Sequence, residues 1–261
     1  MYKIGFAIVA ITALLLAARS FASHAVAPTN TSPAVPVLVE LFTSEGCSSC
    51  PPADALLEKL DTQPFPGGQM IVLSEHVDYW NHIGWTDPYS SSAYSERQSA
   101  YRRRFGLDSV YTPQMVVDGN DEFVGSDTGA AKKAFDKAIR AEKIPVRISN
   151  ATIEGQTLHA HVQAEASVSH PPNVDALVVV ALDHAESQVA KGENAGHRLT
   201  HVAVVRSLTK IGKLKPGKPL SEDVSVALDP VSAARNLRII AFLQEHGQAR
   251  ILGAAEVKVP R

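Results

Sequence analysis

Apolar residues in the first half of the chain recur with two different periods. Short apolar runs predict strands at 37–42 and 70–75, and two runs joined by Asp118-Gly119 predict a hairpin of strands at 114–117 and 122–124. Helical spacing of apolar residues predicts helices at 51–60 and 91–105, and a third helix that Asp127 or Thr128 caps. The predicted order is therefore β-α-β-α-β-β-α.

The pattern changes after Pro145, where helical spacing disappears and short alternating segments begin. Leu158, Ala160 and Val162 alternate with two histidines, as in a strand with one buried face. Seven short strands are predicted, at 146–148, 158–162, 176–182, 199–205, 224–228, 237–242 and 251–259. This number and spacing are typical of a β-sandwich, which we expect at 145–261, after an α/β domain at 36–144.

The first 23 residues have the pattern of a signal peptide. Lys3 precedes an apolar run from Ile4 to Ala18, and small residues up to Ala22 offer a cleavage site. The run is short for a membrane span, and an uncleaved anchor is the alternative. Residues 24–35, rich in Pro, Ser and Thr, are expected to be a flexible leader. The sequence thus predicts an exported protein, periplasmic or secreted, with no membrane insertion after cleavage.

The charge of the chain argues against some classes of partner. It has 25 Lys and Arg and 27 Asp and Glu, which gives a formal net charge of −2. Loss of Lys3 and Arg19 with the signal peptide changes these counts to 23 and 27, so the charge becomes −4. There is no basic stripe that would indicate nucleic acid, and no glycine-rich loop that would indicate an organic phosphate cofactor.

Cys47 and Cys50, the only cysteines, lie between a predicted strand and a predicted helix. A strand, a Cys-x-x-Cys and a helix in this order are typical of thioredoxin-like redox sites, and so is the element order of the whole region. At the start of a helix, Cys47 would be an exposed, attacking thiolate, and Cys50 would close the internal disulfide. A purely structural disulfide would gain little stability from so short a loop.

Two further positions are candidate catalytic residues. Pro113 precedes a predicted strand, where a thioredoxin-like fold places a cis-proline facing the dithiol; a trans-proline that starts the strand is the alternative. Glu40 interrupts an apolar strand seven residues before Cys47. A carboxylate buried there could move protons during disulfide exchange, or it could face solvent or pair with a buried cation.

The connection from His76 to Pro88 is long and aromatic, and such loops are often functional. We expect Trp80 and His76, together with Thr112 beside the predicted cis-proline, to contact the substrate. The alternative is that the aromatic side chains only pack one domain against the other. The loop at 192–198 either faces the same cleft or is a simple turn.

Metal binding is an alternative use of the two cysteines. A structural zinc site normally needs four ligands, and there is no second cysteine pair. His76 or His82 could complete a copper or zinc site with the cysteines. A copper-binding protein and a non-enzymatic thioredoxin-like module that binds a partner therefore remain as alternatives to a metal-free redox site.

Several runs resemble a family of exported thioredoxin-like proteins of unknown function from bacteria and plants. These runs are 39–54, 76–80, 111–114, 192–196 and 199–201. The resemblance covers most of the chain after the signal peptide and implies a thioredoxin-like fold with Cys47 and Cys50 as the redox pair. It supplies no substrate. Ser48-Ser49 replaces the Gly-Pro that common thioredoxin-like reductases carry between their cysteines, which leaves the direction of the redox reaction open.

Together the patterns predict an exported thiol–disulfide oxidoreductase that acts on protein thiols and disulfides. Cys47 and Cys50 would form its redox-active disulfide without a cofactor. Its partners would be a thiol-containing protein substrate and a second redox protein that resets the pair.

Overall fold

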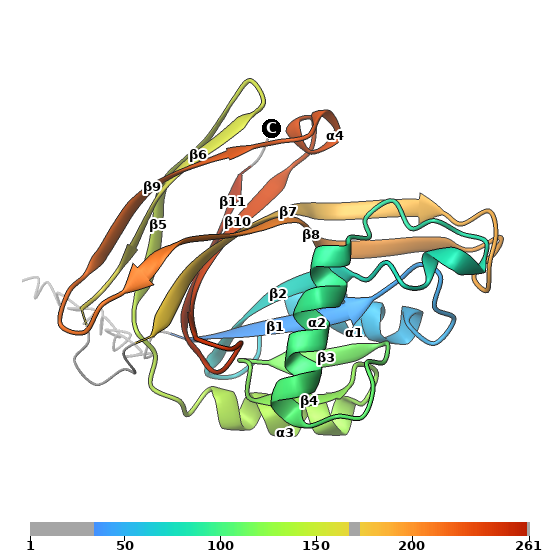
Figure 1. The fold of residues 1–261 in the computed structure, drawn as a ribbon, viewed down its shortest axis with the longest axis horizontal. Coiled ribbons are helices and arrows are strands. Elements are labelled where there is room, and N and C mark those ends of the chain that lie inside the picture. Colours follow the sequence, from blue (N-terminus) through green and yellow to red (C-terminus); the bar gives the residue numbers. More distant parts are fainter. Residues whose placement is uncertain (1–33, 167–172, 260–261) are drawn as a thin grey trace, which may run out of the picture. The chain divides into compact units, whose positions relative to one another are not determined.

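A sheet of eight strands runs through the part of the chain that the computed structural model describes, residues 34–166 and 173–259 (Figure 1). Its strand order is β11-β10-β7-β8-β2-β1-β3-β4, and three further strands form a second sheet in the order β5-β6-β9. Within these described residues, no helix is both long and apolar enough to span a membrane. The predicted signal peptide at 1–23 and most of the predicted leader lie outside them.

The first half contains each predicted element in the predicted order. The elements are β1 (Val35–Thr43), α1 (Pro51–Thr62), β2 (Gly68–His76), α2 (Ser92–Phe105), β3 (Gln114–Val117), β4 (Asp121–Val124) and α3 (Thr128–Ala138), with a short 3-10 helix, η1 (Asn81–Ile83), that the pattern does not predict. β1 pairs in parallel with β2 and antiparallel with β3, which pairs with β4. Asp127 caps α3 as expected, because its carboxylate accepts hydrogen bonds from the first free amides of the helix.

The second half contains all seven predicted strands, and three of them, β5, β7 and β8, are far longer than predicted. The seven strands are β5 (Val146–Glu154), β6 (Thr157–Ala164), β7 (Val174–Gln188), β8 (Arg198–Leu214), β9 (Leu220–Ala227), β10 (Leu237–Glu245) and β11 (Ile251–Val259), with a single helical turn, α4 (Pro230–Ala233). The small sheet packs against β7 and β10, as the layers of a sandwich do, but β7, β8, β10 and β11 also extend the sheet of the first half. Strand periodicity reports which face of a strand is buried, but it does not report which strand lies beside it.

Apolar side chains pack on both faces of the large sheet. On one face, Leu41 of β1 belongs to a core with Leu57 of α1 and with residues of α3. On the other face, Leu38 of β1 belongs to a core with Tyr94 of α2 and with residues of β7, β8 and β10. A third core lies between the small sheet and β7 and β10. The even and odd residues of β1 therefore face different helices, which decides where each polar residue of this strand lies.

The large sheet crosses the predicted domain boundary at residues 144 and 145. This boundary falls between α3 and β5, yet β8 pairs with β2 at Val204 and Ser74. Residues Ser32–Arg261 form a single compact unit by their contacts. As a result, the loop between β7 and β8 reaches the end of β1 and the start of α1.

Candidate dithiol site

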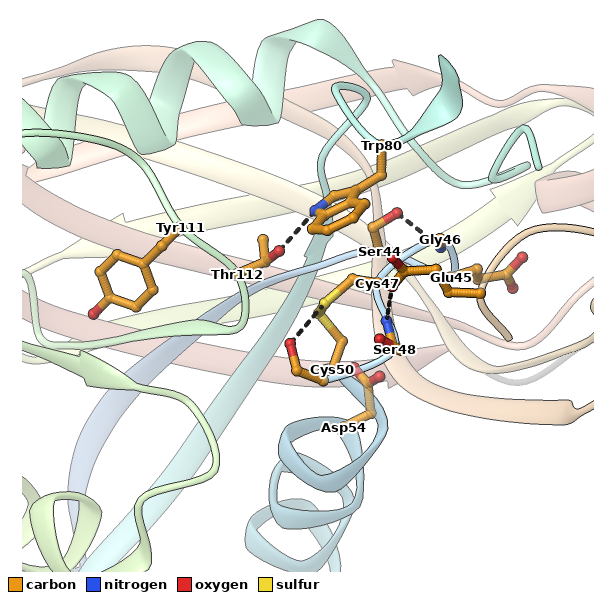
Figure 2. Close-up of a disulfide and its surroundings, with 12 residues drawn as sticks. Ser44, Glu45, Gly46, Cys47, Ser48, Cys50, Asp54, Trp80, Tyr111 and Thr112 are labelled. Carbon is orange, nitrogen blue, oxygen red and sulfur yellow. Dashed lines mark hydrogen bonds between the residues drawn. A yellow bond between two sulfur atoms is a disulfide. The ribbon is translucent and has the colours of Figure 1, made fainter. Parts of the chain in front are cut away.

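Cys47 and Cys50 lie in the loop between β1 and α1 and are joined by a disulfide (Figure 2). The loop is a tight turn, in which the amide of Cys47 donates to Ser44 O (3.1 Å) and the amide of Cys50 donates to Cys47 O (3.2 Å). Gly46 allows Trp80 to approach, because a Cβ at position 46 would lie 3.1 Å from the Cβ of Trp80. The turn places both sulfurs at the N-terminal end of α1.

Both cysteines are fully buried, which corrects the expectation that Cys47 is exposed. Ser48 and Ser49 between them remain exposed. The Sγ atom of Cys47 lies 3.4 Å from the hydroxyl of Ser49. An incoming thiol can therefore reach the serines in this conformation but not the sulfurs.

The loop between β7 and β8 contacts the dithiol loop. The side-chain amide of Asn194 donates to Glu45 O (2.9 Å) and to Cys47 O (3.0 Å), and the carboxylate of Glu193 accepts from the amide of Ser48 (3.1 Å). Hydrogen bonding to Ser48 lowers the pKa of Glu193. Of the two interpretations of this loop, the structure supports the one in which it faces the dithiol.

The N-terminus of α1 offers a thiolate fewer amides than a helix start usually does. Pro51 and Pro52 have no N–H, and the amides of Ala53 and Asp54 both donate to Cys50 O, at 2.8 and 3.1 Å. Four free amides are normal at a helix start, and here two are missing and two are used. The helix dipole still favours negative charge, but other groups must help to stabilise a thiolate.

Trp80, Thr112 and Pro113 lie together beside the disulfide loop. The Thr112–Pro113 bond is cis, as the sequence predicts. The indole N–H of Trp80 donates to the hydroxyl of Thr112 (2.7 Å), and Figure 2 shows both side chains next to Cys47. This part of the predicted substrate contact is thus brought together.

His76, the third predicted contact residue, lies below the surface. It is fully buried, and its Nδ1 lies 2.7 Å from Asp87 Oδ2. Burial by itself raises the pKa of Asp87, but the charge and hydrogen bond of His76 and the amides of Glu45 and Tyr89 outweigh burial and lower it. His76 therefore supports the site from beneath and does not form its outer wall.

A second buried histidine, His201 of β8, lies between two carboxylates. Its Nε2 is 3.4 Å from Glu45 Oε1, and its Nδ1 is 3.8 Å from Asp54 Oδ1. The rings of His76 and His201 meet edge to face, with centroids 4.6 Å apart. The indole of Trp85 donates to the other oxygen of Glu45 (2.8 Å). Together these residues form a buried polar layer between the dithiol loop and the strands below it.

Glu40, the predicted proton carrier, lies on the opposite face of the sheet from α1. It accepts hydrogen bonds from Arg97 (2.6 Å) and from the hydroxyl of Tyr101 (2.5 Å), both on α2. Its neighbour Leu41 is the residue that faces α1. Glu40 thus takes the alternative role weighed from the sequence, that of a carboxylate paired with a buried cation.

In this structure the two candidate sulfur ligands are bonded to each other. Across 34–166 and 173–259, no group of three or more His, Cys, Asp or Glu side chains is arranged to hold a metal ion. His82, the other histidine considered as a ligand, belongs to the short helix η1.

Five polar residues of the site were not singled out from the sequence: Glu45, Asp54, Asp87, Asn194 and His201. Asn194 and His201 lie in two of the runs that carry the family resemblance, and Asp87 lies in the long aromatic connection. Those runs could have directed attention to these residues. Asn194 and His201 reach Cys47 only through the β7–β8 hairpin, whose position no local sequence pattern predicts.

The comparisons with known proteins agree with a single fold over nearly the whole described chain. A family described as "Protein of unknown function (DUF1223)" matches residues 38–244. The chain belongs to this family. No curated protein matches it.

Two solved structures are similar over most of their length. A protein from Agrobacterium tumefaciens, determined by X-ray crystallography in a structural genomics programme, has 28% identity and a TM-score of 0.64, with 86% of this chain and 94% of that chain covered. HBP35 of Porphyromonas gingivalis has 13% identity and a TM-score of 0.61, with 87% of this chain and 76% of that chain covered. The second likeness concerns the fold alone.

Proposed function

We propose that this DUF1223 protein is an exported thiol–disulfide oxidoreductase whose first half is a thioredoxin-like domain. The observation that carries the proposal is the disulfide between Cys47 and Cys50 at the start of α1, next to the cis Thr112–Pro113 bond. The strand order β2-β1-β3-β4 and the element order β-α-β-α-β-β-α support the fold assignment. The chain has only two cysteines, and they form one disulfide that closes a very short loop. Such a disulfide adds little stability, which favours a redox role over a structural one.

The proposed reaction is thiol–disulfide exchange. The thiolate of a substrate protein bonds to Sγ of Cys47, the Cys47–Cys50 bond breaks, and its electron pair leaves with Sγ of Cys50. A second substrate thiolate then attacks the first substrate sulfur and releases Cys47 as a thiolate. The substrate dithiol is oxidised to a disulfide, and the protein gains two electrons and two protons. The reverse sequence reduces a substrate disulfide.

Trp80 and Thr112 form the proposed contact surface for the substrate, and the β7–β8 loop controls access to it. Both sulfurs are fully buried in the oxidised protein, so the dithiol loop must move before exchange can begin, and Asn194 and Glu193 hold that loop in place. A partner that opens this loop would be selected over small thiols. This supports a protein substrate and a separate redox protein that resets the pair.

Export places the protein in an oxidising compartment, where a disulfide persists. The signal-peptide pattern at residues 1–23 and the disulfide itself support this localisation, in the periplasm or outside the cell.

The burial of both cysteines also favours a second candidate, a non-enzymatic module that binds a partner through the Trp80 and Thr112 surface. In that case the disulfide would hold the loop in shape and would not exchange.

One experiment separates these candidates. The folded full-length protein is equilibrated with dithiothreitol, and the thiols are trapped with an alkylating reagent and counted. For the oxidoreductase we expect reversible reduction of the pair without unfolding. We also expect Cys47 of the Cys50→Ser variant to attack a peptide disulfide, forming a mixed disulfide with one half of the peptide and releasing the other half as a thiol. The Cys47→Ser variant is the matched control and should form no such adduct in the folded state. A disulfide that is reduced only on unfolding, with no adduct in Cys50→Ser, would refute the redox proposal in favour of the binding module.

A further inference from the structure

Buried polar atoms beneath the disulfide have unused hydrogen-bonding capacity. Glu45 Oε1, Asp54 Oδ1 and both ring nitrogens of His201 have no partner other than one another, at the long distances of 3.4 and 3.8 Å, although all three residues are buried. Buried polar atoms in native proteins are normally satisfied, so a group of this kind requires a functional explanation. The redox mechanism above assigns it none.

His201 carries a positive charge within this group. Burial alone lowers the pKa of His201, but hydrogen bonding to Asp54 and Glu45 and the charge of these carboxylates raise it to about 10. The imidazole is therefore protonated at neutral pH. His201 lies 3.4 Å from Glu45 and 3.8 Å from Asp54, so its proton is held between two carboxylates inside the molecule.

Other titratable groups also face His201. His76 of β2 meets it edge to face at 4.6 Å, and Tyr89 of the long connection lies with its ring centroid 6.1 Å away. Asp87 is bound to His76 and to the amides of Glu45 and Tyr89. Its charge is thereby compensated locally, so Glu45 and Asp54 are the groups that hold the proton of His201.

Asp54 connects this group to the dithiol. It follows Cys50 by four residues on α1, and residues with this spacing lie on the same face of a helix. Its amide donates to Cys50 O (3.1 Å), and Figure 2 shows its side chain in the first turn of the helix below Cys50. Glu45 precedes Cys47 by two residues, and Asn194 binds the carbonyls of both. Both carboxylates thus belong to the dithiol segment, whereas the histidine comes from β8.

We propose that His201 is a positioning residue of the dithiol site, which acts through Asp54 to give a proton to Cys50 when the disulfide opens and to accept it when the disulfide forms again. This inference rests on the proposed redox function and adds pH control to the same site. When Cys50 leaves with the electron pair of the broken bond, it is protonated by Asp54, which takes a proton from His201. Solvent then returns to His201 the proton that the external thiol released on ionisation.

The test follows the ionisation of Cys50 directly. In a Cys47→Ser background of the full chain, Cys50 is the sole thiol, and the ultraviolet absorbance of its thiolate gives its pKa. His201→Gln removes the positive charge, so we expect the pKa of Cys50 to rise by about one unit or more. Asp54→Asn removes one carboxylate and leaves His201 beside Glu45, so we expect the pKa of Cys50 to fall. His161→Gln is the matched control, because His161 pairs with the exposed Asp223 in the small sheet, and it should change nothing.

Opposite shifts in the two variants support the inference, because a His201 that only packs against the loop would not raise the pKa of Cys50 when its charge is removed. An unchanged pKa in both variants, or shifts of the same sign, overturns it. If wild-type protein still exchanges with dithiothreitol in that case, the redox proposal stands; if wild-type protein does not exchange, both proposals are refuted. Should His201→Gln fail to fold, His201→Asn replaces it with the same rise expected, and an unchanged pKa or a fall overturns the inference.

Discussion

Single side chains of the second half decide how accessible the dithiol is. Asn194 is almost fully buried and binds two backbone carbonyls of the dithiol loop, at 2.9 and 3.0 Å. Without it, Glu45 O would lose this partner and Cys47 O would keep only the amide of Cys50, and a buried carbonyl left unpaired costs about 1–3 kcal/mol. The same contact therefore stabilises the conformation of the dithiol loop in which both sulfurs are buried.

We predict that Asn194→Ala accelerates reduction of the disulfide by dithiothreitol by about tenfold or more, because the open form of the β7–β8 loop becomes more populated. The rate is measured by rapid quenching and alkylation of the released thiols. Gln188→Ala is the control, since Gln188 binds only the exposed carbonyl of Gly196 in the same loop. Equal rates in the two variants would show that Asn194 does not limit access.

At the scale of elements, α2 is attached to the sheet by a buried polar network. Arg97 of α2 donates to Glu40 of β1 (2.6 Å) and lies 3.6 Å from Glu75 of β2, while Tyr101 also donates to Glu40. One guanidinium thus faces two buried carboxylates. Burial and the charge of Glu40 raise the pKa of Glu75 well above its ordinary value, against the lowering effect of Arg97, and neither oxygen of Glu75 has a hydrogen-bond partner. The network orients α2 but leaves the carboxyl group of Glu75 buried without a hydrogen bond.

Substitutions at the two ends of this network should have opposite effects on stability. Arg97→Met leaves two acids buried without a cation and should lower the free energy of unfolding by about 3–5 kcal/mol. Glu75→Gln should raise it at neutral pH. The pKa of Glu75 is higher in the folded than in the unfolded protein. Its contribution to stability is therefore complete at a pH below its pKa in the unfolded protein, and it is lost as the pH rises through its pKa in the folded protein. The advantage of the glutamine variant should therefore grow with pH in urea unfolding measured from acid to neutral pH. A constant difference would contradict this assignment.

At the scale of the whole molecule, the two halves of the chain share one sheet and one site. β8 pairs with β2, and Val202 and Ala203 of β8 belong to the core beneath α1. His201 and Asn194 complete the surroundings of cysteines that lie about 150 residues earlier in the chain. The proposed thioredoxin-like region thus has one sheet edge that the second half pairs with, and the second half completes the core on both faces of its sheet.

We predict that residues 36–144 expressed alone do not form a stable monomer, because the edge of β2 and the apolar surface under α1 become exposed. Circular dichroism and size-exclusion chromatography should show an unfolded or aggregated fragment. The chain from residue 36 to 261 is the control and should unfold in urea in one cooperative transition. A monomeric fragment with its own cooperative transition would restore the boundary predicted from the sequence.

Local patterns in the sequence determined the elements, because strand alternation, helical spacing, the Asp127 cap and the glycine turns are properties of neighbouring residues. They located the Cys-x-x-Cys at the start of a helix and the proline before β3, and the bond to Pro113 is cis as expected. They could not assign Glu40, because a buried carboxylate in a strand can face either side of a sheet and only the packing of α2 shows that it meets Arg97.

Tertiary structure alone decided how the dithiol is covered and what lies beneath it. Strand pairing between residues far apart leaves no period in the sequence, so nothing local predicted that β7 and β8 would join the first-half sheet and carry Asn194 and His201 to Cys47 and Cys50. The contact of Asn194 with the dithiol loop and the position of His201 between Glu45 and Asp54 both follow from that one pairing. The sequence by itself identified the redox pair as a hypothesis, and the fold supplied its access loop and the charged group under it.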